Sequence, residues 1–354
     1  MMFDLPSDDT LYAALLARDP AYDGRAWVGV TSTGIFCRLT CPARKPRREN
    51  CVFHDSPGAC LAAGFRPCKR CHPLGVAAGA YDPVVPPLLA ALEARPEHRW
   101  TEADVTALGL DPSTVRRVFK RAFGMTFLDM ARQRRLRDGF LALGRGETVI
   151  AAQLEAGFES PSAFRAAFAR LLGLAPGHLR ADAPLRADWI ATPLGDMIAV
   201  SCTHRLHLLE FADRRALAAE VQRLARNTPG GLGIGPMPPT EQIRAELAAY
   251  FAGTSADFTT PLALHGSAFT REVWQALRQI PPGETRSYGA LARSLGRPGS
   301  QRAVARANGA NQIALVIPCH RVIGADGALT GYGGGLWRKQ RLLEIEARWR
   351  PAPA

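Results

Sequence analysis

The clearest chemistry in this sequence lies in a cluster of cysteines near its start. Six of the eight cysteines fall within residues 37–71, and four of them form two close pairs, Cys37-x3-Cys41 and Cys68-x2-Cys71. Each pair can occupy two corners of a tetrahedral zinc site. In a reducing cytosol such crowding indicates metal binding and not disulfides. We therefore predict one Zn²⁺ ion bound by Cys37, Cys41, Cys68 and Cys71.

Other residues of this segment are alternative zinc ligands, namely His54, His72, Cys51 and Cys60. Only His72 stands in a comparably short pair with a cysteine, because it adjoins Cys71. We interpret Cys51 and Cys60 as small apolar residues. A site made only of thiolates is usually structural, so the spacing alone assigns no reactivity to any of the four.

A second candidate nucleophile is Cys319, next to His320. The pair follows a short apolar run from Ile313 to Ile317. A Cys-His pair taken alone is usually structural, so its assignment depends on the surrounding sequence. The eighth cysteine, Cys202, has no matching role and is interpreted as a core residue.

Length and composition restrict what can position these residues. A chain of 354 residues is too long for one hydrophobic core, and its 47% hydrophobic and 21% charged residues are ordinary for a globular protein. The net charge of +12 is divided equally between the two halves, which favours a polyanion such as nucleic acid as partner. The sequence has no run of eighteen apolar residues and no signal-like start, so we expect a cytoplasmic protein without membrane contact.

The N-terminal segment is expected to form a small α/β domain. Residues 27–30 and 35–36 flank the turn-like Ser32-Thr33-Gly34, which indicates a hairpin that delivers Cys37. A short helix is expected from Leu11 to Arg18. The proline-rich residues 83–87 indicate a joint between domains, because proline biases its neighbours away from helix.

Residues 88–179 have an almost continuous helical pattern that is broken at glycines. Thr101 can cap one helix and Ser113 can begin the next, which is a helix-turn-helix pattern, and the pattern returns over residues 150–172. Candidate DNA contacts on the second helices are Arg116, Arg117 and Arg165.

The remaining chain mixes both kinds of element. Strands are expected at residues 197–200 and 205–211, and helices at 214–226 and 241–251, before a compact helical segment that follows Gly266. The predicted fold is therefore multidomain α+β. Its segments are a small zinc-bound α/β domain (1–80), an all-α double helix-turn-helix domain (81–182), a mixed α/β subdomain (183–265) and a mainly helical domain (266–354).

Three segments of the N-terminal part resemble the zinc domain of the Ada family: Thr33-Gly34-Ile35-Phe36-Cys37-Arg38, Arg48-Glu49-Asn50 and residues 62–71. The resemblance implies that Cys37 takes a methyl group from a DNA phosphotriester, a reaction that suits a thiolate kept deprotonated by zinc. Four thiolates on Zn²⁺ total −2, so methylation of one lessens repulsion from DNA phosphates. The residues expected to contact phosphates are Arg38, Arg44, Lys45, Arg47, Arg48, Arg66, Lys69 and Arg70.

The helical segment resembles the AraC-type pair of helix-turn-helix motifs, through Ala156-Gly157-Phe158, Phe164, Phe168 and Gly173-Leu174-Ala175-Pro176. The aromatic and aliphatic residues are expected in the core. The arginines of the second helices are expected to face a DNA groove.

The chain from about Gly266 to Ala347 resembles the O6-alkylguanine-DNA alkyltransferases, in segments such as Gly283-Glu284-Thr285, Pro318-Cys319-His320-Arg321 and Gly331-Tyr332. Residues 183–265 resemble the amino-terminal subdomain of the same module more weakly. The resemblance implies an alkyltransferase domain with a winged-helix-like helix-turn-helix.

In that family a cysteine attacks the alkyl carbon on guanine O6, and this residue corresponds to Cys319. His320 and Glu346 would draw off its proton through water, and Asn311 would organise the same network. A guanine must leave the duplex to reach a buried thiol. Tyr288, Tyr332 and Arg302 would respectively contact the lesion, line the base pocket and fill the gap in the duplex.

Together these resemblances imply a single-turnover methyltransferase, acting on O6-methylguanine, O4-methylthymine and methylphosphotriesters, that also regulates transcription in the adaptive response to alkylation. The implied cofactor is Zn²⁺, and the partners are alkylated and promoter double-stranded DNA and RNA polymerase, with the protein a monomer. Two alternatives remain open. One is a zinc-containing AraC-type regulator with a vestigial alkyltransferase domain, against which the joint presence of Cys319, His320, Asn311 and Glu346 counts. The other is a repair protein that has lost regulation.

Overall fold

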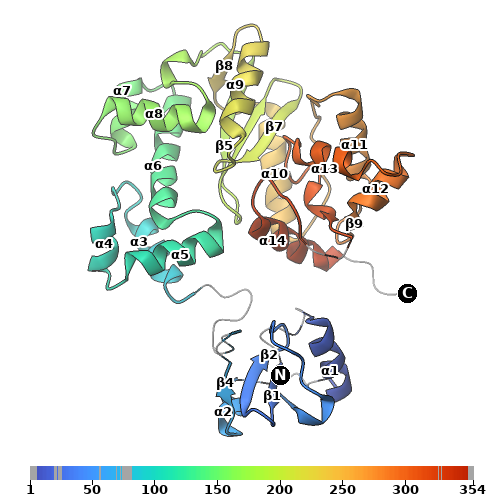
Figure 1. Ribbon diagram of the computed structural model, residues 1–354. Helices are drawn as coiled ribbons and strands as arrows, with labels where there is room; N and C mark the ends of the chain where they lie inside the picture. The colour runs from blue at the N-terminus through green and yellow to red at the C-terminus, as the bar shows by residue number, and fades with distance from the viewer. Residues whose placement is uncertain are drawn as a thin grey trace. The chain divides into compact units, whose positions relative to one another are not determined.

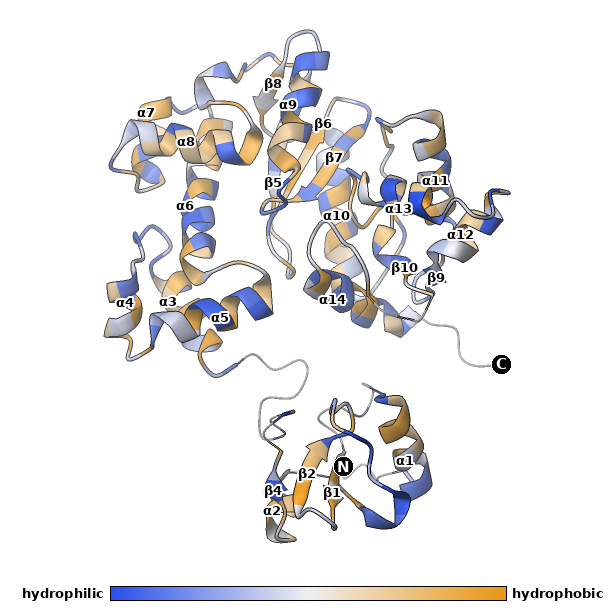
Figure 2. Ribbon diagram, viewed as in Figure 1, coloured by the Kyte–Doolittle hydropathy of each residue, from blue (hydrophilic) through white to orange (hydrophobic). Residues whose placement is uncertain are grey.

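The computed structural model describes residues 6–19, 22, 26–55, 57–68, 70, 71, 73, 82–325, 327 and 329–349. The chain forms two compact units, Met1–Ala90 and Ala91–Ala354 (Figure 1). The longer strands of both units consist mostly of hydrophobic residues, whereas the helices mix hydrophobic and hydrophilic ones (Figure 2). His72 and Lys69, named above as a rival ligand and a phosphate contact, lie outside the described residues.

The first unit is built on a four-stranded sheet with the strand order β3-β1-β2-β4. The predicted hairpin is confirmed: Trp27 pairs with Arg38 and Val30 with Ile35 in antiparallel register. Gly34 has φ +65°, which glycine adopts without a steric cost in this tight turn. The elements are α1 (Asp8–Ala17), β1 (Trp27–Val30), β2 (Ile35–Arg38), β3 (Cys51–His54), α2 (Pro57–Ala62) and β4 (Arg66–Pro67).

The proline-rich residues lie at the start of a helix, and the division between the two compact units falls close to them, between Ala90 and Ala91. Helix α3 (Val85–Ala94) takes Pro86 and Pro87 into its first turn. Amides of a first helical turn have no partner within the helix, so proline costs nothing there. The predicted bias of residues 83–87 away from helix therefore does not hold from Val85 onward, whereas the predicted joint agrees with the division of the chain into two units nearby.

Two helix-turn-helix motifs follow, separated by the long helix α6 (Phe127–Gly144). Thr101 caps the first motif, as predicted, in a reciprocal bond with Asp104. The second helix begins at Pro112 with Asp111 as its cap, one residue before the predicted start at Ser113. The motif helices are α4 (Glu102–Ala107), α5 (Pro112–Phe123), α7 (Val149–Glu155) and α8 (Pro161–Leu172).

The two second helices share one local design. Each begins with proline at its first position and ends at a glycine with positive φ, Gly124 at +72° and Gly173 at +71°. Arg116 and Arg165 lie four residues after those prolines and both are exposed. The motifs therefore place the two arginines equivalently.

The next segment forms a four-stranded sheet with the order β7-β6-β5-β8. Strands β6 and β7 were predicted, whereas β5 and β8 were not, and α10 starts earlier than expected at Pro238. Helix α9 starts at Leu217 and not at Arg214, whose side chain is used in ion pairs. The elements are β5 (Leu185–Ile190), β6 (Met197–Ser201), β7 (Leu206–Phe211), α9 (Leu217–Asn227), β8 (Leu232–Ile234) and α10 (Pro238–Ala252).

The second helix-turn-helix and this sheet share one hydrophobic core. Phe140, Phe168 and Leu172 pack in the same buried cluster as Trp189 and Val221. Gln222 Nε2 donates to Gly173 O at 3.0 Å, and a Cβ on Gly173 would lie 2.2 Å from a backbone oxygen of α9. Packing therefore continues across residues 182 and 183, where the sequence changes character.

The C-terminal segment is mainly helical, as expected, and packs on the opposite side of the same sheet. Leu209 of β7 bonds to the backbone of residues 312 and 314, which ties the approach to Cys319 to the sheet. Its elements are α11 (Ala268–Arg278), β9 (Arg286–Ser287), α12 (Tyr288–Ser294), α13 (Gln301–Gly309), η4 (Cys319–Arg321), β10 (Val322–Ile323) and α14 (Leu336–Glu346).

The multidomain α+β architecture agrees with the prediction. None of the described helices combines the length and the apolar character that crossing a bilayer requires.

Candidate functional site

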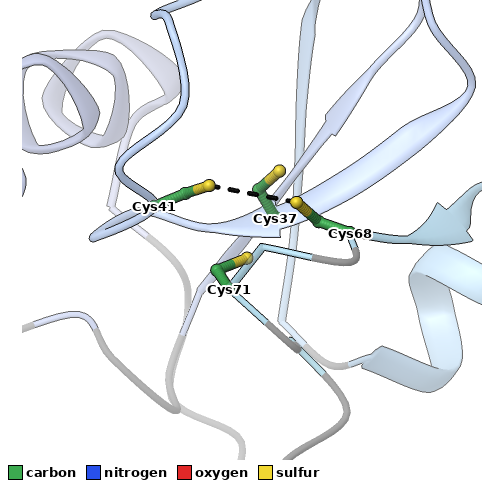
Figure 3. Close-up of side chains that lie close together, drawn as sticks. All are labelled: Cys37, Cys41, Cys68 and Cys71. Carbon is green, nitrogen blue, oxygen red and sulfur yellow. Dashed lines mark hydrogen bonds between the residues drawn. The ribbon is translucent and has the colours of Figure 1, made fainter.

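The four predicted zinc ligands converge on one point (Figure 3). Cys37 is carried by β2, Cys41 lies in the turn after it, and Cys68 and Cys71 follow β4. All four sulfur atoms lie within 4.8 Å of one another, and Cys41 Sγ is 4.0 Å from Cys68 Sγ. Four thiolates around Zn²⁺, with Zn–S bonds of about 2.3 Å, need sulfur separations of this size. The cluster therefore fits Zn²⁺.

Two of these sulfurs accept hydrogen bonds from backbone amides. The amide of Arg38 donates to Cys71 Sγ and that of Arg70 to Cys68 Sγ, both at 3.4 Å. The side-chain hydrogen bond between Cys37 and Cys71 raises the pKa of Cys37 and lowers that of Cys71 to about 5, and burial raises the pKa of Cys41. Cys51 packs in the same hydrophobic core as Cys37, Cys41 and Cys68, and Cys60 is buried in a neighbouring one, but neither sulfur belongs to the ligand group. Burial raises the pKa of both thiols, in keeping with their interpretation as apolar residues.

The basic residues near the cluster fall into two groups. Lys45 Nζ donates to Leu39 O and Cys41 O, and Arg48 pairs with Asp8 and Asp9, so these two side chains hold the fold around the metal site. The second group consists of arginines that remain accessible to solvent. Four are exposed, Arg44, Arg47, Arg66 and Arg70, and Arg38 is half-buried.

The helix-turn-helix arginines lie on exposed helix faces. Arg116 pairs with Glu102 of the preceding helix, and Arg117 Nη2 donates to Thr114 Oγ1 at 3.2 Å. Arg165 is exposed on α8. The buried faces of the same helices carry the aromatic residues, as expected, with Phe119, Phe164 and Phe168 fully buried.

Cys319 lies in a pocket of about 420 Å³ between the sheet and the C-terminal helices. Tyr288, Asn311 and Tyr332 line the same pocket, so the structure brings these four predicted residues together. The chain reaches Cys319 through a tight turn in which Leu315 has φ +69°. That conformation costs a non-glycine residue about 1–3 kcal/mol and is typical of functional sites.

Asn311 holds the Cys319 sulfur in place. Its Nδ2 donates to Cys319 Sγ at 3.1 Å and to Ile317 O at 2.8 Å, while its Oδ1 accepts from the amide of Ile313. Burial raises the pKa of Cys319 to about 11, and the Asn311 contact opposes this effect. The thiol is therefore protonated in the resting protein and needs a proton acceptor.

His320 and Glu346 form a fully buried pair beside this pocket, with Nε2 2.9 Å from Oε1. Burial opposes ionisation of Glu346, but His320 and Arg321 hold its pKa well below the usual range. An ionised Glu346 accepts the Nε2 proton of His320, which leaves Nδ1 to accept another. Among the described residues, this Nδ1 atom has no hydrogen-bond partner.

Sequence reasoning missed two side-chain partners of Glu346. Arg321 donates to both carboxylate oxygens, at 2.7 and 2.8 Å, and Tyr250 OH donates to Oε1 at 2.9 Å. Arg321 directly follows the Cys-His pair, and a buried arginine at that position could have indicated an acidic partner. Tyr250 comes from α10, 96 residues away, and no local signal could have found it.

Arg302 lies apart from the pocket, on the exposed face of α13. It lines a surface hollow with Arg306 one helical turn further along and with Phe269 of α11. Helices α12 and α13 form a third helix-turn-helix. Its first helix, α12, begins with Tyr288, which lines the pocket of Cys319. Arg306 was not among the predicted contacts, although its spacing of four from Arg302 places both on one face.

A cysteine metal centre, paired helix-turn-helix motifs and an alkyltransferase fold in this order define a class of multidomain proteins that act on DNA. Three family models match the chain: "Metal binding domain of Ada" over residues 10–73, "Helix-turn-helix domain" over 105–182, and "6-O-methylguanine DNA methyltransferase, DNA binding domain" over 268–348. The chain is 36% identical to the "Bifunctional transcriptional activator/DNA repair enzyme Ada" of Escherichia coli, over 96% of this chain and 97% of that protein. It belongs to the Ada family, as the sequence predicted.

Two partial matches concern the C-terminal half. A "Methylated-DNA--protein-cysteine methyltransferase" of Mycolicibacterium paratuberculosis is 62% identical over 30% of this chain and 65% of that protein. The crystal structure of the O6-methylguanine methyltransferase of Mycobacterium tuberculosis matches 48% of this chain and 96% of that chain, with 39% identity and a TM-score of 0.42.

Proposed function

We propose that this protein repairs methylated double-stranded DNA by moving methyl groups irreversibly onto two of its own cysteines, Cys319 and Cys37. The observation that carries the proposal is the Cys319 pocket, in which Asn311 holds the sulfur beside the buried His320–Glu346 pair. In this role the protein is a methylated-DNA-[protein]-cysteine S-methyltransferase. Each acceptor reacts once, because a thioether does not readily revert.

At Cys319 the reaction is a displacement on carbon. His320 accepts the thiol proton by the water relay of the family, and Glu346 stabilises the resulting imidazolium. The thiolate attacks the methyl carbon on O6 of guanine or O4 of thymine, so that an S–C bond forms as the C–O bond breaks. The electron pair stays on the base oxygen, and the base takes up a proton.

The base must enter the pocket from outside the duplex stack, at a cost of a few kcal/mol. We propose that Tyr288 and Tyr332 contact the extruded base, since both line the pocket with Cys319. Arg302, exposed on the second helix of the third helix-turn-helix, would fill the gap left in the duplex. Arg306 lies on the same face and would contact the adjacent phosphates.

At the N-terminal site Cys37, Cys41, Cys68 and Cys71 would hold Zn²⁺, which when bound keeps all four sulfurs as thiolates. Cys37 would take a methyl group from a phosphotriester, with the phosphate diester as the leaving group. Its methylation removes one negative charge close to the DNA. The candidate phosphate contacts there are Arg38, Arg66 and Arg70.

Regulation would follow from that charge change. Arg116, Arg117 and Arg165 would contact the grooves of a promoter, and methylated protein would activate transcription together with RNA polymerase. We propose that the protein acts as a monomer in the cytoplasm, in four functional segments: 1–80, 81–182, 183–265 and 266–354.

The test is mass mapping of isotope-labelled methyl groups after incubation with methylated duplex DNA. Label from O6-methylguanine should appear on Cys319, and label from phosphotriesters on Cys37. Cys319→Ala should lose guanine repair and keep triester repair, and Cys37→Ala should do the reverse. A folded variant that lost both activities would contradict the assignment. Absence of label on wild-type Cys319 would favour a regulator with a vestigial alkyltransferase domain.

A further inference from the structure

A buried cluster of charged side chains borders the pocket of Cys319. Arg214, in the turn after β7, places its Nη1 atom 3.1 Å from Glu210 Oε1 and 2.6 Å from Glu220 Oε2. The side chains of Arg214 and Glu210 are only 6% and 4% exposed. Both residues line the pocket that contains Cys319. The methyl transfer described above uses neither of them.

Arg214 is fixed between three walls of this pocket. Besides its two carboxylate partners, its Nη2 atom donates to Gly309 O, at the end of α13, at 3.4 Å. The glycine-rich loop passes so close that a Cβ on Gly333 would lie 2.8 Å from Arg214 Nε. The guanidinium is therefore held by contacts with β7, α13 and the loop.

The cluster holds more potential negative charge than positive charge. Two carboxylates face one guanidinium, and Arg338 of α14 is a more distant cation. Burial raises the pKa of Glu210 to about 8, so its carboxyl group is neutral at pH 7. Burial also raises the pKa of Glu220, and Arg214 opposes that rise, so the guanidinium charge near Cys319 faces two carboxyl groups whose ionisation burial disfavours.

These charges act on the nucleophile in opposite directions. Beyond burial and the Asn311 contact, an ionised Glu210 raises the pKa of Cys319, whereas Arg214 lowers it. The other titratable groups around Cys319 are Lys339 on α14, Tyr332 in the glycine-rich loop, Tyr288 on α12 and the His320–Glu346 pair.

We propose that Glu210 and Arg214 are positioning residues that set the electrostatic field at the Cys319 thiol. The positive charge of Arg214 favours the thiolate form of Cys319. When the carboxyl group of Glu210 is ionised, its negative charge offsets that effect. The inference rests on the proposed role of Cys319 as the methyl acceptor. It adds a control of reactivity that comes from the sheet and not from the Cys-His motif.

The experiment measures the thiol without DNA. Full-length, zinc-loaded protein is treated with methyl iodide between pH 6.5 and 9.5, and methylation of Cys319 is followed by mass mapping. The thiolate displaces iodide, so the rate constant reports the thiolate fraction. Methyl transfer from O6-methylguanine DNA is measured in parallel.

Glu210→Gln removes the charge and keeps the shape. At pH 6.5 the methylation rate of Cys319 in this variant should equal the wild-type rate. At pH 9 it should be about tenfold faster, which corresponds to a Cys319 pKa that is lower by about one unit. Arg214→Gln should be about tenfold slower across the range. Arg214→Lys, which keeps the charge, should restore most of the rate.

Matched controls come from the exposed Arg341–Glu344 pair on α14, whose atoms are 2.8 Å apart. Arg341→Gln and Glu344→Gln should leave the rate unchanged at every pH. If Arg214→Gln does not fold, the Glu210→Gln and Arg214→Lys variants still decide the question.

Opposite effects of Glu210→Gln and Arg214→Gln would support the proposal, because simple destabilisation would move both in one direction. Equal or same-sign effects, or a Glu210→Gln variant that matches wild type at pH 9, would overturn it. The two variants could show opposite effects with methyl iodide while the wild-type protein accepts no methyl group from DNA. That result would refute the proposed function but would leave the electrostatic effect on the Cys319 thiol standing.

Discussion

Substitution of Glu346 by glutamine should be the most damaging conservative change in the second unit. The carboxylate is fully buried and accepts from His320, from two nitrogens of Arg321 and from Tyr250. Glutamine keeps the shape but leaves the guanidinium of Arg321, 5% exposed, without a counter-charge. Breaking a buried ion pair in this way costs about 3–5 kcal/mol.

For a unit of this size, each kcal/mol lowers the unfolding midpoint by about 2–4 °C, so Glu346→Gln should lower it by roughly 6–20 °C. Differential scanning calorimetry of the full chain measures this. Glu344→Gln is the matched control, because its exposed pair with Arg341 should contribute less than about 1 kcal/mol. Equal midpoints for the two variants would refute the reasoning.

The same carboxylate gives stability a defined pH dependence. Its folded pKa is lowered, so its contribution is fully present above the unfolded value of about 4.3 and is lost as the pH falls through the folded value. Wild-type stability should therefore fall below about pH 4 more steeply than that of Glu346→Gln. Parallel acid profiles for the two proteins would show that Glu346 is not ionised in the fold.

The other predictions concern the remaining sites. Purified protein should contain one zinc per chain by elemental analysis, and Cys68→Ala should lose it; full zinc content in that variant would argue against the site. Methylation of Cys37 should tighten promoter binding by about tenfold, more at low salt, because a charge at roughly 5–6 Å from a phosphate is worth about 1.5 kcal/mol at an effective dielectric of about 40. Titration at two salt concentrations tests this, and equal affinities would exclude an electrostatic switch. Arg302→Ala should slow repair of a lesion in duplex DNA far more than in single-stranded DNA, and an equal loss on both would exclude a gap-filling role.

The sequence predicted well where function is encoded by neighbours in the chain. The hairpin that carries Cys37, the cap at Thr101 and the Cys319-His320 pair depend on a few adjacent residues, and each has a recognisable local pattern. The zinc site joins residues 34 positions apart, yet each half of it is a short pair, so spacing was sufficient.

Features that depend on long-range packing could not be predicted in this way. Strands β5 and β8 pair with each other across more than forty residues, and β5 has little of the alternation that marks a half-exposed strand, because five of its six residues are buried. The partners of Glu346 and the Glu210–Arg214–Glu220 cluster come from distant elements. A charged residue in a sequence is ordinarily a surface residue, and only the fold shows which ones are buried.

The two proposed acceptor cysteines solve one chemical problem by different means. A thiol must lose its proton to attack carbon. At the N-terminal site a bound Zn²⁺ ion would keep the sulfur deprotonated at all times. Cys319 instead sits in a buried pocket that raises its pKa to about 11, so it is almost wholly protonated at rest. This arrangement protects the thiol from oxidants and stray electrophiles, since the thiolate is the reactive form. Under the proposed function, reactivity at Cys319 is then assembled from surrounding groups: a proton acceptor in His320, a hydrogen-bond donor in Asn311 and a nearby positive charge in Arg214. The reactivity of the metal site would depend on the charge of its four ligands, whereas the reactivity of Cys319 would depend on the fold around it. For that reason the residues that would act on Cys319 come from three separate parts of the chain.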